Sequence, residues 1–187
     1  TFGLTIKAEV ENLTAITLSN PENYQFSVKF KCSNCQEDHD RHVVFAASDI
    51  VAHSNGKAES NIFKKCNFCS TEGSCNILLD SLNPYCPNGG GEKYIQKSKP
   101  SKSKRSNSPK RKNGSNTKDS EHVLIELEAR NLIPISWEPF DGWKAYGIES
   151  GSLFDGINLE DEWSDFDEKA DLPVMITDIV AGVTGRV

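Results

Sequence analysis

The side chains best suited to chemistry in this sequence are cysteine thiols that occur in two pairs with the same spacing. Cys32 and Cys35 form one C-x₂-C pair, Cys66 and Cys69 form the other, and thirty residues separate them. Each pair predicts a tight turn that directs two sulfur atoms at one centre, and two such turns complete a tetrahedral set of thiolates. With all four positions filled by sulfur, the spacing predicts one structural Zn²⁺ with no open position for water.

Two other interpretations of the cysteine pairs remain open. A C-x₂-C pair also serves as the dithiol of thiol–disulfide oxidoreductases, in which either pair would cycle between dithiol and disulfide. The pairs can also be two reduced turns that bind nothing. Neither pair precedes a clear helical pattern whose N-terminus would lower a thiol pKa, so a zinc site is the preferred prediction.

The other cysteines and the nearby histidines are not predicted to be metal ligands. Cys75 and Cys86 do not form a pair with ligand spacing, and we expect ordinary buried or surface thiols there. His39 and His42 follow the first pair closely, but four sulfurs already complete a zinc site. The predicted metal ligands are therefore the four paired cysteines alone.

Length and composition predict one domain with its own apolar core. The chain has 187 residues, 36% of them hydrophobic, which is enough for an apolar core. A zinc ion would therefore stabilise only the region around its ligands. No apolar stretch is long enough for a membrane span, and residues 1–10 lack a signal-peptide pattern. We expect a cytoplasmic protein, with access to the nucleus, whose thiols are reduced. We find no catalytic triad in motif context, phosphate loop or dinucleotide fingerprint, and we expect no enzymatic activity.

Charge is distributed unevenly, with a basic insert in an acidic body. The net charge is −6, yet residues 93–118 hold ten Lys and Arg and no acid, leaving 11 basic against 27 acidic residues elsewhere. No apolar residue follows Ile95 in this tract, so we predict a disordered insert. It is either a solvated loop or, over residues 97–118, an arm for nucleic acid. Residues 155–171 hold eight acids and one Lys, and form either a docking surface for basic groups or an irregular surface segment.

Strand patterns and an internal repeat predict the fold. Apolar and polar residues alternate over residues 4–10, 24–30 and 122–128, while helical periodicity is scarce. At an offset of 119 residues, five identities recur: Ile6, Glu9, Asn12, Leu13 and Ile16 on Ile125, Glu128, Asn131, Leu132 and Ile135. We predict two similar β halves related by an approximate two-fold axis, a zinc-bearing half of about residues 1–86 and a zinc-less half of about residues 120–187. At this offset Tyr24 falls on Trp143, Cys32 on Gly151 and Cys35 on Phe154.

Taken together, these motifs resemble the eukaryotic CXXC motif-containing zinc-binding protein family. The resemblance covers nearly the whole chain except residues 97–118, and its pieces are residues 10–14, 31–35, 65–69, 84–85, 147–151, 157–159 and 163–169. It implies a mainly β fold of two packed antiparallel sheets, one zinc on the four paired cysteines, and no established enzymatic activity. We therefore expect a non-catalytic interaction or metal-homeostasis module that acts as a monomer with an unknown protein partner.

Overall fold

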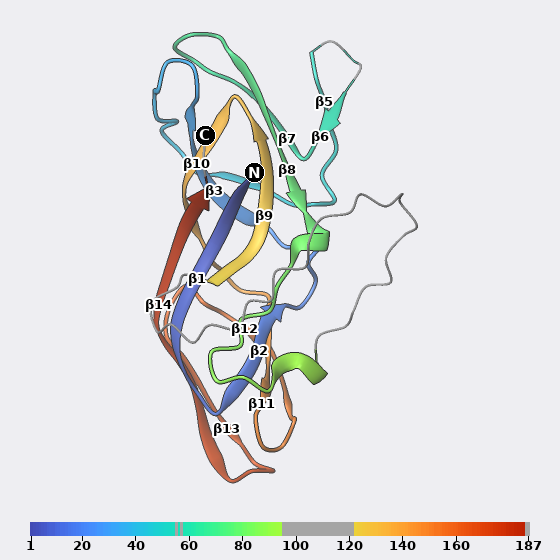
Figure 1. The fold of residues 1–187 in the computed structure, drawn as a ribbon, viewed down its shortest axis with the longest axis vertical. Coiled ribbons are helices and arrows are strands. Elements are labelled where there is room, and N and C mark those ends of the chain that lie inside the picture. The colour runs from blue at the N-terminus through green and yellow to red at the C-terminus, as the bar shows by residue number, and fades with distance from the viewer. Residues whose placement is uncertain (55, 57, 95–121, 186–187) are drawn as a thin grey trace, which may run out of the picture.

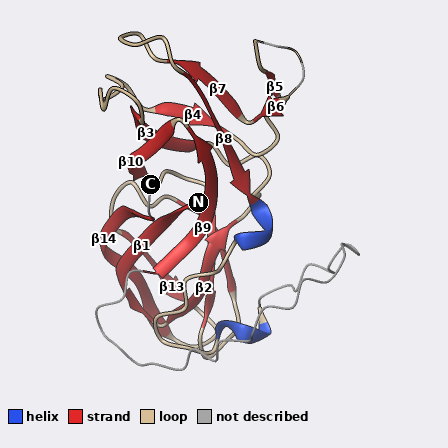
Figure 2. Cartoon of the chain, turned by 45° about the horizontal axis from the view of Figure 1, so that its top comes forward, coloured by secondary structure: helices blue, strands red, loops and turns tan. Residues whose placement is uncertain are grey.

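The chain folds almost entirely into β-strands (Figure 1). The computed structural model describes residues 1–54, 56, 58–94 and 122–185. The strands before the basic tract are β1 (Phe2–Glu11), β2 (Leu13–Leu18), β3 (Phe26–Cys32), β4 (Val43–Phe45), β5 (Val51–Ala52), β6 (Glu59–Ser60), β7 (Ile62–Lys65) and β8 (Glu72–Leu78). Those after it are β9 (His122–Arg130), β10 (Leu132–Glu138), β11 (Trp143–Gly147), β12 (Leu153–Ile157), β13 (Trp163–Asp167) and β14 (Leu172–Gly185). The short 3₁₀ helices η1 (Leu79–Ser81) and η2 (Gly91–Lys93) lie between the two sets (Figure 2).

The strands form antiparallel sheets, which confirms the predicted mainly β class. Within the described residues the largest sheet has six strands in the order β13-β14-β1-β9-β8-β7. Two three-stranded sheets, β10-β3-β4 and β12-β11-β2, and the small β5-β6 hairpin complete the set. In Figure 1 the long central strands β1, β9 and β14 run along the molecule, with the β7-β8 and β13 regions at opposite ends.

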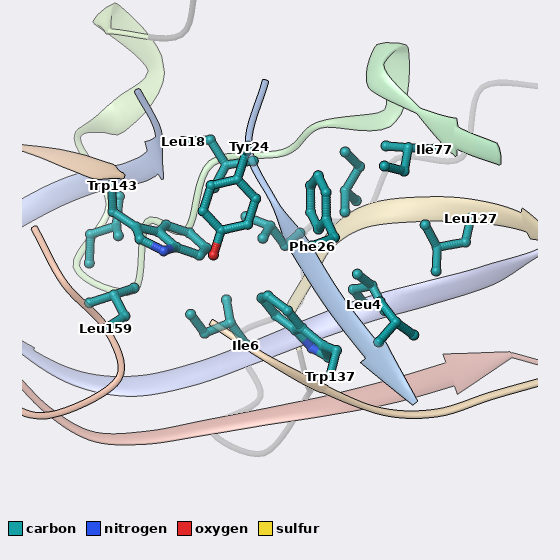
Figure 3. Packing of buried hydrophobic residues seen from close by; sticks show 14 of the residues in the cluster. Leu4, Ile6, Leu18, Tyr24, Phe26, Ile77, Leu127, Trp137, Trp143 and Leu159 are labelled. Atoms are coloured by element: carbon teal, nitrogen blue, oxygen red, sulfur yellow. The ribbon is translucent and has the colours of Figure 1, made fainter. Parts of the chain in front are cut away.

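The apolar core lies between the six-stranded sheet and the two smaller sheets. Leu4 and Ile6 of the central strand β1 are fully buried, and they face aromatic side chains that come from β3, β10 and β11. Figure 3 shows Tyr24 beside Trp143 and Phe26, with ring centroids 5.8 and 4.8 Å away in edge-to-face geometry. Ile6 and Ala8 of β1 are buried whereas Lys7 and Glu9 are exposed, which explains the alternation of apolar and polar residues in this strand.

The predicted repeat is visible in two pairs of consecutive strands, β1-β2 and β9-β10. In each pair a single asparagine, Asn12 or Asn131, separates two strands that belong to different sheets, and its φ angle is 57° or 55°. Asn tolerates this left-handed conformation better than most residues, which accounts for the identity at both positions. The two strand pairs thus repeat at the predicted offset of 119 residues.

Beyond these strand pairs the correspondence shifts by four residues from the one that a constant offset predicts. The β10-β3 pairs Leu132↔Cys32 and Trp137↔Val28 match the β2-β11 pairs Leu13↔Gly147 and Leu18↔Trp143. Cys32 therefore corresponds to Gly147, not Gly151, and Trp143 corresponds to Val28, not Tyr24. The connection from the repeated strand pair to the next strand is four residues shorter in the second copy, and a fixed offset cannot follow that change.

The two similar units exchange strands between the halves of the sequence. β2 pairs with β11, and β10 pairs with β3, so each small sheet takes strands from both halves. The cysteine-bearing unit therefore consists of β3, β4, β7 and β8 together with β9 and β10. Of the predicted insert, Lys93 ends η2 and the Tyr94 ring stacks on Tyr146 at 4.3 Å, while residues 95–118 lie outside the described residues. No helix in the described part of the chain is long and apolar enough to span a membrane.

Candidate metal centre

Each cysteine pair occupies a tight turn at the end of a strand. The first turn, residues 32–37, follows β3, and the second, residues 66–71, follows β7. In each turn the N–H of the first cysteine donates to the carbonyl five residues later at 2.9 Å, and its own carbonyl accepts from the residue four positions later at 3.0 Å. That later residue, Gln36 or Ser70, has a positive φ of 64° or 60°. The two turns are thus built alike, and both fold back on the first cysteine.

The four cysteine sulfurs converge on one point. Cys32 Sγ lies 3.6 Å from Cys69 Sγ, Cys35 Sγ lies 3.6 Å from Cys66 Sγ, and all four atoms lie within 4.8 Å of one another. Sulfurs about 2.3 Å from a tetrahedral zinc stand about 3.8 Å apart, so the spacing suits such an ion. Cys32 and Cys66 are buried, whereas Cys35 and Cys69 are partly exposed.

Three polar residues support this cluster from outside it. Asn34 Nδ2 donates to Thr71 Oγ1 at 3.1 Å, and Thr71 Oγ1 lies 3.2 Å from Cys69 Sγ, which leaves the Thr71 hydroxyl hydrogen free to point at the sulfur. Asn131 joins the two turns, because its carbonyl accepts from Ser33 N at 3.2 Å and its side chain donates to Glu72 O at 2.9 Å. Outer contacts of this kind orient ligands and tune affinity for the metal.

The thiols of the cluster differ in acidity. Hydrogen bonds from the side chain and backbone of Thr71 lower the pKa of Cys69 to about 5, although partial desolvation of the thiol acts in the opposite direction. At Cys35 the Glu37 N–H acts to lower the pKa, but burial and the neighbouring sulfurs outweigh it and raise that pKa to about 12. Sulfurs this close cannot all ionise without a compensating cation. A divalent ion supplies that compensation, and Lys31 and Lys64 beside the turns add positive charge.

The remaining candidates lie outside the cluster. His42 Nε2 is 3.8 Å from Glu138 Oε1 and 3.4 Å from Ser136 Oγ, so it points toward β10. Burial raises the pKa of the Cys75 thiol on β8 to about 12. Cys86 and His39 also stand apart from the four sulfurs, which are the one group of three or more metal-ligand side chains found in the described residues.

The second unit contains the same pair of turns without cysteines. Gly147 N donates to Ser152 O at 2.9 Å and Gly151 N donates to Gly147 O at 3.0 Å, as in the first turn of the metal centre. Asn12 joins this pair as Asn131 joins the other, with Ile148 N donating to its carbonyl at 3.0 Å and its side chain donating to Pro173 O at 2.7 Å. The four cysteine positions correspond to Gly147, Ser150, Asp167 and Ala170.

A carboxylate occupies the centre of this second pair of turns. The Asp167 side chain is only 3% exposed and accepts hydrogen bonds from the Ser150 hydroxyl, from Ser152 Oγ at 3.2 Å, and from the N–H groups of Lys169 and Ala170 at 3.1 and 3.3 Å. The Ser150 hydrogen bond is the largest of the effects that lower the pKa of Asp167. Hydrogen bonds to Asp167 thus hold this second pair of turns together. They stand at the place that the sulfur cluster occupies in the first pair.

Sequence reasoning identified the four cysteines but missed Thr71, Asn131 and Asp167. The identity of Asn12 with Asn131 was a usable signal, because both residues join a pair of turns. No pattern in the residues around Asp167 indicated its role, because that role depends on Ser150 and Ser152 in a turn distant in the sequence.

The comparisons with known proteins cover almost the full chain. The family model described as CXXC motif containing zinc binding protein, eukaryotic, matches residues 3–183. The chain is 32% identical over 181 residues to the protein of that name from Xenopus laevis, covering 95% of this chain and 94% of the relative. It is 30% identical over 181 residues, with the same coverage of both chains, to the Homo sapiens protein of that name.

Solved structures agree in fold over the whole chain. The crystal structure of C1orf123 superposes with a TM-score of 0.76 at 27% identity and covers 99% of each chain. A hypothetical protein from Plasmodium falciparum has a TM-score of 0.70 at 17% identity over 98% of each chain, which shows the shared fold. With the family model matched from end to end and the cysteine cluster assembled, the chain belongs to the eukaryotic family of CXXC motif containing zinc binding proteins.

Proposed function

We propose that Cys32, Cys35, Cys66 and Cys69 bind one structural Zn²⁺ and that the protein is a non-catalytic interaction module. The observation that carries this proposal is the convergence of four sulfurs within 4.8 Å. A tetrathiolate site has no position for an activated water, so its contribution is to stabilise the two turns and the surface around them. The zinc-binding description of the family supports the choice of metal.

The experiment measures metal and thiols in the purified chain. Elemental analysis is expected to give about one zinc per chain, and chelation is expected to release four thiols beyond Cys75 and Cys86. The Cys66→Ser variant should lose the zinc and melt at a lower temperature, whereas the matched variant Cys86→Ser, outside the cluster, should keep it. A Cys66→Ser protein that keeps one zinc per chain and an unchanged melting temperature would contradict the proposal.

The non-catalytic part of the proposal has its own test. If the metal is closed to solvent ligands, the Co²⁺-substituted protein should show the absorption of a tetrahedral tetrathiolate site, and added azide should leave it unchanged. An azide-dependent spectrum would indicate an open coordination position. If the role is metal handling, a competing chelator should remove zinc from the folded chain without first unfolding it.

The oxidoreductase alternative is favoured by one feature, the pKa of Cys69, lowered to about 5 by hydrogen bonds from Thr71. A low-pKa thiol is the reactive form in dithiol enzymes. This alternative predicts purified chain without metal and with oxidised pairs, which the same thiol count measures. A nucleic-acid role for residues 97–118 stays a prediction, since those residues lie outside the described part.

We also propose that the protein acts in the cytoplasm, a reducing compartment, and that it binds its protein partner as a monomer. All six cysteines are free thiols, as expected where disulfides do not form. Fractionation and sedimentation of the zinc-loaded chain test these two points.

A further inference from the structure

A pocket of about 460 Å³ opens beside the metal centre. Its lining comes from the loop after the first turn, with Asp38, His39 and Arg41, and from the end of β7 and the second turn, with Lys64 and Phe68. Cys66, one of the cluster sulfurs, also lines it. The shape of this pocket therefore depends on the same turns that the metal would hold together.

His39 is a buried polar side chain in this pocket with unused hydrogen-bonding capacity. The residue is 7% exposed, and neither Nδ1 nor Nε2 has a hydrogen-bond partner. Burial is the largest of the effects that lower the pKa of His39, so the imidazole is neutral and offers one donor and one acceptor. Both nitrogens are buried in this ring orientation, so a ligand in the pocket reaches one of them only after a half-turn of the ring, which exchanges the nitrogens with Cδ2 and Cε1.

An exposed aromatic ring forms another part of the wall. Phe68 lies at the tip of the second turn and is 77% exposed. Its position is fixed by the turn, because Cys66 N donates to Thr71 O and Ser70 N donates to Cys66 O on either side of it. A rigidly held aromatic residue beside a pocket is typical of the centre of a protein interface.

The charges at the rim nearly balance. Glu37, Asp38 and Asp40 face Arg41 and Lys64, for a formal charge of −1, and the two signs act on His39 in opposite directions. A rim of this kind does not select an anion or a cation. The chemistry that remains is a neutral hydrogen bond at His39 and an apolar contact at Phe68.

We propose that this pocket binds a tyrosine side chain of a partner protein, with the phenol hydroxyl bonded to His39 and the ring against Phe68. A phenol hydroxyl can donate to the unprotonated ring nitrogen or accept from the N–H of the other, so it makes one of the two missing hydrogen bonds with either tautomer. An aromatic ring makes the apolar contact with little loss of conformational freedom. The inference rests on the proposed function as an interaction module and names the contact that the module makes.

The test uses p-cresol as the probe on the full, zinc-loaded chain, followed by ¹H–¹⁵N NMR. We expect saturable shifts at the amides of Asp38, Lys64 and Phe68, and binding about tenfold tighter than that of toluene, which lacks the hydroxyl. His39→Leu should reduce p-cresol to the affinity of toluene, and Phe68→Ala should weaken both ligands. Phe166→Ala, which removes a 49% exposed ring from β13 in the second unit, is the matched control and should change neither.

Four outcomes overturn the proposal. They are no binding of p-cresol, equal binding of p-cresol and toluene, p-cresol binding that survives His39→Leu and Phe68→Ala, and saturable binding of acetate in place of p-cresol. Because Phe68 is exposed, its variant remains informative even if His39→Leu does not fold. If the zinc-loaded chain does not bind p-cresol, the proposed tyrosine pocket is refuted and the proposed function is not. If the chain takes up no zinc, the proposed function is refuted.

Discussion

Replacing Gly147 with Ala tests whether Asp167 substitutes for the sulfur cluster in the second unit. A Cβ at Gly147 would overlap Asp167 Oδ2 and lie 2.7 Å from Ser150 Oγ, two atoms that are joined by a hydrogen bond. The backbone itself accepts a side chain at this place, because φ of Gly147 is not positive and Cys32 occupies the equivalent position in the first unit. Any penalty therefore comes from the Asp167 cluster.

The magnitude follows from two opposing effects. Overpacking by one methyl group costs about 1–3 kcal/mol, and the loss of backbone freedom in the unfolded chain returns about 0.5 kcal/mol. We expect Gly147→Ala to lower the free energy of unfolding by about 1–2 kcal/mol. In an Asp167→Ala background the overlapping oxygen is gone and the Ser150 hydroxyl is free to rotate, so the same substitution should cost about 0 kcal/mol.

The assay is urea unfolding of the four zinc-loaded proteins of this double-mutant cycle, followed by circular dichroism. Equal slopes with denaturant would show that the native and unfolded states are comparable among the variants. A Gly147→Ala protein as stable as the wild type would refute the reasoning, as would the same cost in both backgrounds. Either result would mean that Asp167 does not hold the two turns in the arrangement described.

Three further predictions concern the side chains that support the two pairs of turns. The pKa of Asp167 in the folded protein is lowered from 3.8, so its carboxylate stabilises the fold above that pH and loses this effect as the pH falls through the folded-state pKa. The difference in unfolding free energy between wild type and Asp167→Asn should therefore become smaller below pH 3.8. Unfolding of both proteins measured over a series of acidic pH values tests this. Asn131→Ala should weaken zinc binding in a chelator competition while Asn12→Ala leaves it unchanged, because only Asn131 joins the cysteine turns; equal effects would contradict that assignment. Thr71→Val should reduce zinc affinity by about 10–100-fold, since the hydroxyl near Cys69 Sγ is lost at nearly constant volume, and an unchanged affinity would show that this contact is idle.

The sequence could predict the parts of the fold that depend on local pattern. Alternation identified β1, β3 and β9, and the paired spacing identified the cysteine turns, because both signals depend on residues a few positions apart. The identity of Asn12 with Asn131 located the repeated strand pair, since the left-handed conformation restricts the residue type there.

The rest depends on contacts between distant segments. A fixed offset placed Cys32 opposite Gly151, because one loop is four residues shorter in the second copy and no local pattern records the difference. The pocket at His39 is also invisible in sequence, where His39 reads as a surplus ligand. The other side of this pocket comes from Lys64 and Phe68, and these residues lie near His39 because the two turns meet at the sulfurs.

The exchange of strands between the two halves affects how the metal centre is built. The cysteines come from residues 32–69, but the residue that joins their two turns, Asn131, lies between β9 and β10 of the other sequence half. Asn12 in turn joins the turns around Asp167. Neither half of the sequence therefore contains a complete pair of turns with its connecting asparagine. Folding of the metal centre requires the far half of the chain to be in place, so zinc uptake reports on the assembly of the whole domain rather than on the cysteine turns alone.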